Sequence, residues 1–424
     1  MKILWSVNVV IEEAGAVMGQ RAVMQVSWLN RLSRVIRDET ELVICYPTNE
    51  TREMKCADGD RVRFYAIPRK SRNGFRYESG LTACYREILQ KERPDVIHIW
   101  GTEFPSTLSM VQACEQEQLL EHTVVSIQGM ISKLADHFYA SLPFPVRHRY
   151  AFKNLLRGNN LYWYRRKFVQ RGKYEVQALQ KLRHAIGRTD WDRAALLSIN
   201  PKIRYHYNSE TLREPFYEGN WKPENCERHR IFMSQSGLPY KGMHYALHAL
   251  HEIVTQYPDT HLYVTGRNLQ PDVTFREALR MDGYERYLQS LIRKYHLEKH
   301  VTFLGTLNAE QMKEQYLKAN VFILPSAMEN SPNALGEAML LGIPSIASDV
   351  GGVKNLMEHG KEGLVYQHDV PYVLAYYVMQ VFEEQPEVLM ERSKASREHA
   401  GRLYDAGKNM RELLEIYREI GNRD

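Results

Sequence analysis

The amino-acid sequence predicts two α/β domains, each with a parallel β-sheet covered by helices on both faces. Short apolar runs typical of buried strands alternate with longer stretches of helical periodicity along the chain, and this alternation favours parallel sheets. The pattern starts again after residue 230. The chain has 424 residues, which is more than one hydrophobic core usually serves. Both observations indicate two domains.

The order of the expected elements shows where functional residues should lie. The strand candidates of the first half are residues 2–8, 41–46, 62–68, 95–100 and 123–128, and residues 21–36 have the period of an amphipathic helix. The strand candidates of the second half are residues 230–235, 261–266, 300–305, 320–325, 343–348 and 363–366. Open parallel sheets bind ligands at the carboxyl ends of their strands. Functional residues are therefore expected directly after these strands.

The elements also set the expected domain boundaries. They place an N-terminal Rossmann-like domain at residues 1–213 and a C-terminal one at residues 231–395. The residues between them, 214–230, are polar and aperiodic and are expected to form a linker. The final residues, 396–424, are expected to form a helix that packs back toward the N-terminal domain. A basic, aromatic-rich insertion is expected in the N-terminal domain at about residues 131–180.

The composition excludes several classes of protein. The net charge of +5 is small for a general polyanion binder, and no apolar run approaches the roughly 18 residues of a membrane span. The five cysteines are scattered and never form a CxxC pair, which argues against a disulfide scaffold or a zinc ribbon. Asn8, Glu12 and Glu13 interrupt or close the apolar N-terminus, so it does not fit a signal peptide. A cytoplasmic protein without a bound metal is expected.

The segment from 320 to 348 combines a strand, a loop and the start of a helix. The strand ends at Pro325. Ser331 and Pro332 suit the N-cap and the first position of a helix that Gly342 ends. The first amides of this helix lack intrahelical partners and carry the positive end of its dipole, so they suit a phosphate group. These phosphate-binding amides are expected at Asn333, Ala334 and Leu335.

Two carboxylates flank the start of this helix. Glu329 lies in the loop before it, and Glu337 lies on its second turn. An ionised carboxylate only accepts hydrogen bonds, and it therefore suits paired hydroxyl groups on a ribose or a sugar. The alternative interpretation is that both residues are solvated charges at the end of a helix.

Glu329 and Glu337, with the strand before them and the AMLLGIP and DVGG runs after them, resemble the signature of the family-4 retaining glycosyltransferases, which have the GT-B fold. The resemblance implies that Glu329 contacts the hydroxyls of a donor sugar and that Glu337 holds the ribose of its nucleotide. It also implies a nucleotide-diphosphate sugar as donor substrate, retention of the anomeric configuration, and no cofactor or metal. The resemblance covers the C-terminal half and, more loosely, the strand order of the N-terminal half.

Two positions depart from the pattern of that family. Its members carry an Arg and, a little further on, a Lys on the donor diphosphate. Lys241 matches the Lys, but Ser236 stands where the Arg is expected, and Arg267 is an alternative source of that charge. Many members also place a His where this chain has Gln128, which can bond a hydroxyl but cannot act as an acid or base near neutral pH. By resemblance, Lys241 and Gln128 join Glu329 as the expected catalytic residues.

Further candidate site residues lie in the N-terminal half. Gly15 and Gly19 follow the first strand, where members of the family use a glycine-rich loop to approach the donor phosphate and the acceptor. A simple strand-to-helix turn is the alternative. His98 and Glu103, in the run HIWGTE, are expected to line a substrate site. The alternative for His98 is a position in the core, which is common for a lone His in a strand.

Residues 143–174 contain nine Lys or Arg residues and no Asp or Glu, and aromatic residues interleave with them. Arg165, Arg166 and Lys167 form the centre of this basic stretch. Such a composition is typical of a segment that binds an anionic membrane surface, which would place the protein at the inner face of the plasma membrane. A solvated insertion is the alternative. Binding to nucleic acid is disfavoured because no RNA-binding module is found.

The leading hypothesis is an enzyme that transfers a sugar from a nucleotide-diphosphate donor to the hydroxyl of a glycan or lipid-linked acceptor. The resemblance suggests a role in the synthesis of a cell-surface polysaccharide or glycolipid. Two alternatives stay open. One is a nucleotide-sugar epimerase of the same fold, for which the required acids and His are not found. The other is a nucleotide-sugar-binding pseudo-enzyme that supports a partner, which Ser236 and Gln128 keep open.

Overall fold

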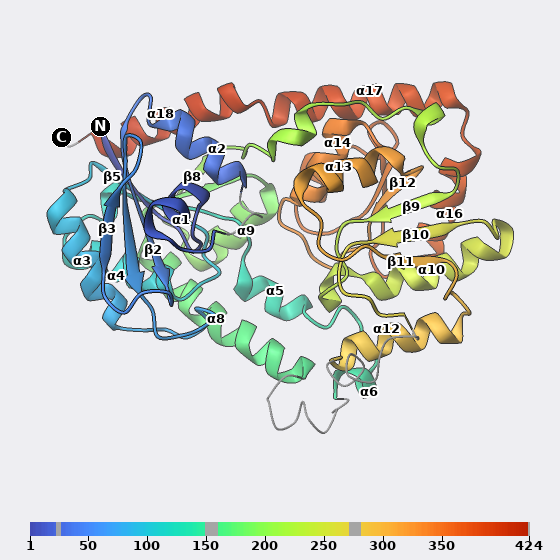
Figure 1. Cartoon of the computed structure of the whole chain (residues 1–424), viewed down its shortest axis with the longest axis horizontal. Helices are drawn as coiled ribbons and strands as arrows, with labels where there is room; N and C mark the ends of the chain where they lie inside the picture. The colour runs from blue at the N-terminus through green and yellow to red at the C-terminus, as the bar shows by residue number, and fades with distance from the viewer. Residues whose placement is uncertain (23–26, 149–159, 271–280, 423–424) are drawn as a thin grey trace. The chain divides into compact units, whose positions relative to one another are not determined.

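The computed structural model describes residues 1–22, 27–148, 160–270 and 281–422 (Figure 1). The chain forms two compact units, each assembled from segments that are not continuous in the sequence. Unit 1 consists of Met1–Ala135, Lys167–Thr211 and Tyr404–Asp424, and unit 2 consists of Asp136–Arg166 and Leu212–Leu403. Among the described residues, no helix is both long and apolar enough to cross a membrane.

Unit 1 contains an 8-stranded sheet in the order β3-β4-β2-β1-β5-β6-β7-β8. All neighbouring strands are parallel except β3, which pairs antiparallel with β4. The strands are β1 (Lys2–Ser6), β2 (Glu41–Thr48), β3 (Lys55–Asp58), β4 (Val62–Pro68), β5 (Val96–Trp100), β6 (Thr123–Ser126), β7 (His184–Gly187) and β8 (Arg204–Tyr207). The strands expected in the first half are confirmed. The sequence did not reveal β3, β7 and β8, because they are short and lie at or next to the edges of the sheet.

Each face of this sheet carries its own hydrophobic core, because successive side chains along a strand point to opposite faces. Leu4 and Val43 pack with one group of helices, and Trp5 and Ile44 pack with another. The first group is α3 (Gly80–Glu92), α4 (Ser106–Gln116), α8 (Leu161–Lys181) and α9 (Asp190–Ile199), and the second is α1 (Glu12–Met18), α2 (Ser27–Ile36) and α18 (Ala406–Gly421). The unit is therefore a parallel sheet between two helical layers.

Unit 2 contains a 6-stranded parallel sheet in the order β11-β10-β9-β12-β13-β14. All strands expected in the second half are confirmed, and Figure 1 shows α13 and α14 on one side of this sheet and α10 and α12 on the other. The strands are β9 (Arg230–Met233), β10 (His261–Val264), β11 (Val301–Phe303), β12 (Val321–Leu324), β13 (Ser345–Ser348) and β14 (Leu364–Tyr366). The helices are α10 (Met243–Gln256), α12 (Gly283–Lys294), α13 (Ala309–Lys318), α14 (Asn333–Leu341), α15 (Val353–Leu356), α16 (Pro371–Glu383) and α17 (Pro386–Leu403).

Part of the insertion expected in the N-terminal domain packs in unit 2 instead. Phe138 and Leu142 are fully buried. The carbonyl oxygen of Ala140 accepts hydrogen bonds from Nε2 of His244 at 3.0 Å and from the hydroxyl of Tyr245 at 2.8 Å. Both donors belong to α10, so this segment is anchored to the helical layer of unit 2. In the described part of the insertion, the helices are α5 (Ile131–His137), α6 (Phe144–Arg147) and nearly all of α8.

The residues expected to form a linker are packed rather than free. The chain passes from unit 1 to unit 2 between Thr211 and Leu212, before the expected linker begins. Phe216 and Trp221 are buried, and Nε1 of Trp221 donates to the carbonyl of Ala319 at 2.7 Å. Short 3-10 helices at Glu214–Tyr217 and Pro223–Asn225 provide hydrogen bonds for part of the backbone of this segment. The lack of periodicity therefore reflects an irregular but packed segment.

The C-terminal residues form the end of α17 and a separate α18, rather than one helix. The carboxylate of Asp405 accepts from the amide of Lys408 at 2.6 Å and caps α18. In unit 1, the buried hydroxyl of Tyr417 accepts from Nε1 of Trp5 at 3.1 Å and contacts Nδ1 of His98 at 2.5 Å. These bonds tie the last helix to two central strands of the first sheet.

Candidate functional site

The sheet of unit 2 changes direction between β9 and β12. From this point β9, β10 and β11 follow one another toward one edge, and β12, β13 and β14 follow one another toward the other. Open α/β sheets bind ligands at the carboxyl ends of the strands that flank such a switch point. The loops at this position are residues 234–242 after β9 and residues 325–332 after β12.

An ion pair joins these two loops. Nζ of Lys241 lies 2.7 Å from Oε1 of Glu329, and the hydroxyl of Ser326 donates to the same oxygen at 2.7 Å. The Glu329 side chain is 9% exposed and that of Lys241 is 18% exposed. Burial alone would lower the pKa of Lys241, but attraction to Glu329 outweighs it and the pKa is raised. Lys241 is therefore a cation held beside Glu329 at the switch point.

Two glycines allow the loops to come this close. Gly242 has φ +76°, and a Cβ atom there would lie under 3.0 Å from the carbonyl oxygen of Pro325. Gly351, in the loop after β13, has φ +53°, and a Cβ atom there would lie under 3.0 Å from the carbonyl oxygen of Glu329. The amide of Gly352 donates to that same carbonyl at 3.3 Å. Three loops thus fix the backbone around Glu329.

The second predicted carboxylate, Glu337, lies on α14 in a different ion pair. Nε and Nη2 of Arg213 donate to its two oxygens at 2.6 and 2.7 Å. The Glu337 side chain is 3% exposed, and that of Arg213 is 19% exposed. Burial raises the pKa of Glu337, and the bonds from Arg213 oppose this rise. The sequence did not indicate Arg213, because it stands just before an aperiodic segment and its partner is distant in the chain.

The start of α14 differs slightly from the prediction. Pro332 occupies the N-cap, and Asn333 is the first helical residue. Ser331 was expected to cap the helix, but its buried hydroxyl has no hydrogen-bond partner in the part of the chain that the structure describes. The amide of Leu335, expected to bind phosphate, donates to the carbonyl of Pro332 at 3.0 Å. Gly342 ends the helix in the left-handed conformation, as predicted.

The position expected to carry a second cation is neutral and bonded internally. The hydroxyl of Ser236 donates to the carbonyl of Thr265 at 3.0 Å. Gly266, with φ +130°, packs so closely that a Cβ atom there would lie under 3.0 Å from the Ser236 hydroxyl. Arg267, the alternative source of charge, pairs with Glu285 of α12 at 3.1 Å. Ser236 therefore ties the loop after β9 to the loop after β10.

In unit 1, Gln128 lies after β6 and is hydrogen-bonded to a buried ion pair. Its side-chain nitrogen donates to Glu210, and Nη1 of Arg188 lies 2.9 Å from the other oxygen of Glu210. Burial raises the pKa of Glu210, and the charge of Arg188 opposes this. The side-chain nitrogen of Gln128 is therefore oriented by Glu210. The sequence did not indicate Arg188 or Glu210, because they follow separate strands and form no local motif.

Glu103 lies after β5, next to the switch point between β1 and β5 in the sheet of unit 1. Its carboxyl is packed against two glycines: a Cβ atom at Gly101 would lie 2.5 Å from Oε2, and one at Gly129 would lie 3.3 Å from Oε1. Burial raises the pKa of Glu103 to about 7, and the nearby charge of Glu175 adds to the rise while that of Arg171 opposes it. The carboxyl can therefore gain or lose a proton near neutral pH.

The structure places His98 in the core and not in a substrate site. The residue is fully buried, and its ring nitrogens contact the hydroxyl of Tyr417 at 2.5 Å and that of Ser126 at 2.7 Å. Burial lowers the pKa of His98 to about 3, so the ring stays neutral. The prediction that His98 contacts a substrate is therefore wrong. Its two ring nitrogens instead link β5, which carries His98, to α18 and β6.

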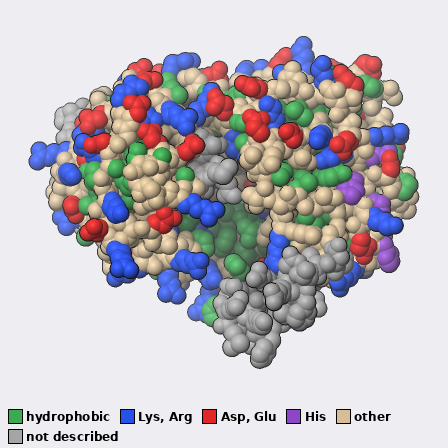
Figure 2. Space-filling model, in the orientation of Figure 1, with side chains coloured by type: hydrophobic (Ala, Val, Ile, Leu, Met, Phe, Trp, Pro, Cys, Tyr) green, Lys and Arg blue, Asp and Glu red, His purple; other side chains and the backbone are tan. Residues whose placement is uncertain are grey.

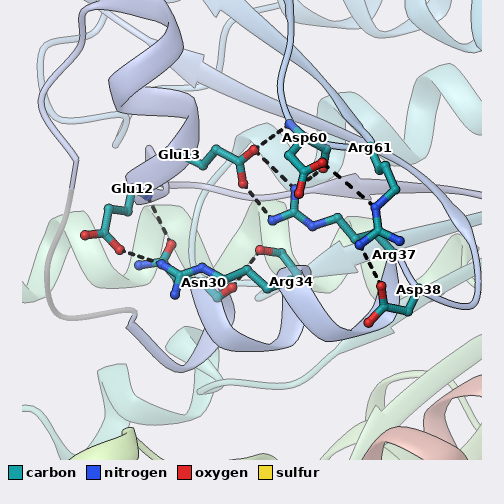
Figure 3. Close-up of polar contacts among 9 residues, drawn as sticks. Glu12, Glu13, Asn30, Arg34, Arg37, Asp38, Asp60 and Arg61 are labelled. Atoms are coloured by element: carbon teal, nitrogen blue, oxygen red, sulfur yellow. Dashed lines mark hydrogen bonds and ion pairs between the residues drawn. The ribbon is translucent and has the colours of Figure 1, made fainter.

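Gly15 and Gly19 belong to helix α1 and its C-terminal cap, so the expected glycine-rich loop is corrected to a short helix. A Cβ atom at Gly15 would lie 2.7 Å from the carbonyl oxygen of Gln20, and Gly19 caps α1 with φ +66°. Figure 3 shows what holds α1 in place: Glu13 pairs with Arg37, directly after the end of α2, at 2.7 Å. Glu13 also accepts from the amide of Asp60 at 2.8 Å. Both glycines therefore have a structural explanation.

The basic stretch 143–174 is described only in part, because residues 149–159 lie outside the described ranges. Phe144 is 70% exposed, and Trp163 is also exposed. The guanidinium of Arg166 lies 5.1 Å from the centre of the Trp163 ring. On the face shown in Figure 2, basic and acidic side chains are otherwise interspersed over the surface. Exposed aromatic rings beside arginines distinguish this stretch.

Comparison with known proteins finds a family match that lies within unit 2. Residues 221–399 match the family described as "Glycosyl transferases group 1", and this range includes Lys241, Glu329 and Glu337. The chain is similar to the putative colanic acid biosynthesis glycosyltransferase WcaL of Salmonella typhimurium, with 33% identity over 143 residues that cover 32% of this chain and 32% of that protein. The matched region spans less than half the length of such curated relatives.

Two solved structures match almost the whole chain. Sucrose-phosphate synthase from Thermosynechococcus elongatus has a TM-score of 0.70 at 15% identity, and the match covers 99% of both chains. HepE from Anabaena, in complex with UDP-glucose, has a TM-score of 0.65 at 16% identity, covering 99% of this chain and 100% of that one. At such low sequence identity, the similarity to these two structures is evidence for the fold alone. It confirms the predicted α/β architecture of two domains with parallel sheets.

The close approach at Gly242 can be tested by substitution. Gly242→Ala forces a side chain into φ +76° and against the Pro325 carbonyl. We expect a loss of stability of about 1–3 kcal/mol, measured as a lower midpoint of thermal unfolding. Gly237→Ala is the matched control, because no atom lies within 4 Å of a Cβ atom at that position of the same loop. Equal midpoints for the two variants would contradict the argument.

Proposed function

Because the chain has the GT-B fold and contains a group 1 glycosyl transferase domain in residues 221–399, we propose that it transfers a sugar from a nucleotide-diphosphate donor to an acceptor hydroxyl. The observation that carries this proposal is the ion pair of Lys241 and Glu329 at the switch point of unit 2, followed directly in the chain by α14, which carries Glu337. A cation and a helix N-terminus are both groups that suit a diphosphate. Two buried carboxylates suit the hydroxyl groups of a sugar and a ribose.

In this proposal the donor binds to unit 2. Lys241 and the amides of Asn333 and Ala334 bind the diphosphate, Glu329 binds hydroxyls of the donor sugar, and Glu337 binds the ribose. Lys241 exchanges part of its contact with Glu329 for the phosphate, and this exchange releases an acceptor position on Glu329 for the sugar. The buried hydroxyl of Ser331 is a further hydrogen-bonding group at the same helix start.

The proposed chemistry is retaining and needs no metal ion. The bond between the anomeric carbon and the phosphate oxygen breaks, and its electron pair leaves with the diphosphate. A bond forms between the acceptor oxygen and the same face of the anomeric carbon, while the acceptor proton moves to the leaving phosphate oxygen. Lys241 and the dipole of α14 stabilise the charge that develops on the diphosphate. The nucleotide sugar is a substrate, so no cofactor is required.

Unit 1 supplies the proposed acceptor-side residues. When the carboxyl of Glu103 is ionised, it can accept a hydrogen bond from the acceptor hydroxyl. Gln128 can offer its side-chain carbonyl oxygen, because its nitrogen is already bonded to Glu210. Both residues follow strands at the carboxyl edge of the sheet, where α/β folds carry their ligands.

We further propose that the acceptor belongs to a cell-surface polysaccharide or glycolipid pathway and is lipid-linked. The similar protein WcaL is named for colanic acid biosynthesis, which supports this class. The basic stretch 143–174 then docks the enzyme on an anionic membrane. Its exposed Phe144 and Trp163 suit the headgroup region, and Arg166 beside Trp163 suits lipid phosphates.

The activity is tested with the purified full chain and a panel of nucleotide sugars that begins with UDP-glucose. Release of nucleoside diphosphate from at least one donor is expected, with or without EDTA, and NMR of the transfer product should show the anomeric configuration of the donor. Absence of release from every donor would support the pseudo-enzyme reading instead. A strict metal requirement or an inverted product would overturn the corresponding part of the mechanism.

The two carboxylates are expected to have separable roles. Glu337→Ala should weaken binding of the free nucleoside diphosphate by about 1.5–3 kcal/mol, the usual contribution of a hydrogen bond to a charged group. Glu329→Gln should lower turnover far more than diphosphate affinity. Glu384→Gln is the control, because Glu384 also pairs with a buried Arg of unit 2, Arg392. Wild-type diphosphate affinity in Glu337→Ala, or wild-type turnover in Glu329→Gln, would refute that residue's role.

Transfer to the acceptor should depend on the ionisation of Glu103. Since its pKa is raised to about 7, the carboxylate form predominates above that pH and is lost below it. We expect kcat/KM for the acceptor to fall as the pH drops through about 7, whereas donor hydrolysis falls less. Glu103→Gln should have lower transfer and no such pH dependence. A wild-type pH profile in Glu103→Gln would show that another group is responsible.

Membrane docking is measured with vesicles of anionic phosphatidylglycerol and of neutral phosphatidylcholine. Wild type should bind only the anionic vesicles, and more weakly at high salt. Replacing Arg165, Arg166 and Lys167 with Gln removes about 1 kcal/mol per charge, so affinity should fall on the order of a hundredfold, while donor hydrolysis remains. Replacing three exposed lysines elsewhere, Lys354, Lys361 and Lys394, should have little effect. Equal losses in both triple variants would point to net charge rather than a docking surface.

A further inference from the structure

We infer that Arg213 is a positioning residue for ribose recognition: it fixes the carboxylate of Glu337 in the orientation that receives the ribose hydroxyls of the donor nucleotide. The inference rests on the proposed function, because it requires that Glu337 binds ribose. Arg213 acts through Glu337 and does not itself contact the nucleotide.

The geometry of the pair restrains the carboxylate strongly. Nε of Arg213 donates to Oε1 of Glu337 at 2.6 Å, and Nη2 donates to Oε2 at 2.7 Å. Guanidinium and carboxylate are both planar, and two parallel bonds between them prevent rotation of either plane. Because both side chains are largely buried, water competes little for these bonds. The plane of the carboxylate is therefore set before a ligand arrives.

The pair does not use all of the hydrogen-bond acceptor positions of Glu337. An ionised carboxylate has about four acceptor positions on its two oxygens, and Arg213 occupies two of them. Among the described residues, no other side chain is hydrogen-bonded to Glu337. The two remaining positions equal in number the paired 2′- and 3′-hydroxyls of a ribose, which the inference assigns to them. A carboxylate in a fixed plane would therefore distinguish a ribose from a sugar that lacks one of these hydroxyls.

Packing holds Arg213 itself in place. Its guanidinium lies 4.8 Å from the centre of the ring of Phe216, which is fully buried. Phe216 packs edge-on against Tyr316 of α13. The hydroxyl of Tyr316 donates to the carbonyl of Ala334 at 2.9 Å, in the first turn of α14. One aromatic pair thus connects Arg213 to the helix that carries Glu337.

Arg213 also keeps Glu337 charged. Burial raises the pKa of Glu337, and the hydrogen bonds and charge of Arg213 oppose that rise. The other titratable group beside the carboxyl is Tyr316, whose pKa burial raises well above its ordinary value, so it remains neutral. Without Arg213 the pKa of Glu337 would rise further. The carboxyl would then protonate as the pH falls, and the protonated form has fewer acceptor positions.

The test compares ribose discrimination in the full-length protein. UDP, GDP and ADP are titrated calorimetrically into wild type, and the tightest of them is then compared with its 2′-deoxy form. Wild type should prefer the ribose form about tenfold or more, as expected for a hydrogen bond to a charged group. In Arg213→Gln, the ratio of the affinity for the ribose nucleotide to that for its 2′-deoxy form should fall toward one. The affinity of this variant for the ribose nucleotide should also decrease as the pH is lowered, whereas that of wild type should change less. Arg213→Lys keeps the positive charge, but its ammonium cannot bond both oxygens of Glu337 in one plane as a guanidinium does. Its affinity ratio should therefore lie between those of wild type and Arg213→Gln.

Arg392→Gln is the matched control, because Arg392 makes a similarly buried bidentate pair with Glu384 in the same unit. It should keep the wild-type ratio even if its thermal midpoint falls. If Arg213→Gln keeps the wild-type ratio of ribose to 2′-deoxy affinity, the inference is wrong and Arg213 only contributes to packing. If Arg213→Gln does not fold, a wild-type ratio in Arg213→Lys overturns it equally. Failure of wild type to bind any of the three nucleotides would instead count against the proposed function.

Discussion

The candidate site depends on the close approach of three backbone loops at the carboxyl ends of β9, β12 and β13. The carbonyl groups of Pro325 and Glu329 occupy the space where a side chain would stand at Gly242 and Gly351. Protein interiors are packed without spare volume, so only a residue without a Cβ atom permits this arrangement. The approach brings Lys241 within 2.7 Å of Glu329 and places both at the point where the sheet changes direction. The ion pair is thus a consequence of backbone packing.

The two ion pairs of this site differ in how readily they can open. Lys241 offers one flexible ammonium to Glu329, whereas Arg213 holds both oxygens of Glu337 in a plane. Buried charges are costly unless they are paired, so each carboxylate keeps a cationic partner in the protein without ligand. In the proposed function, a phosphate of the donor replaces Glu329 as the partner of Lys241. The second pair has no need to open, because its carboxylate retains acceptor positions of its own.

Much of the fold could be predicted because it is encoded locally. Apolar runs predict most of the strands, and residues 320–342 predict a strand, a loop and a helix in the correct order. Features that depend on distant residues could not be predicted. Arg213 bonds Glu337, which lies 124 positions further along the chain, and His98 is held in the core by Ser126 and by the distant Tyr417 of α18. The sequence predicts that the insertion belongs to the N-terminal domain, but the bonds from His244 and Tyr245 to Ala140 hold part of it in unit 2.

The division of both units into separate segments has a consequence for synthesis of the chain on the ribosome. Tyr417 bonds Trp5, but 412 positions separate the two residues. At typical elongation rates this interval is roughly 20–80 s. During that time α18 is absent, so one face of the nascent first sheet, including Trp5 and Ile44, lacks part of its cover. Exposed strands of this kind attract chaperones or aggregate. Packing of α18 is therefore the step that completes the cover of β1, long after β1 itself has been translated.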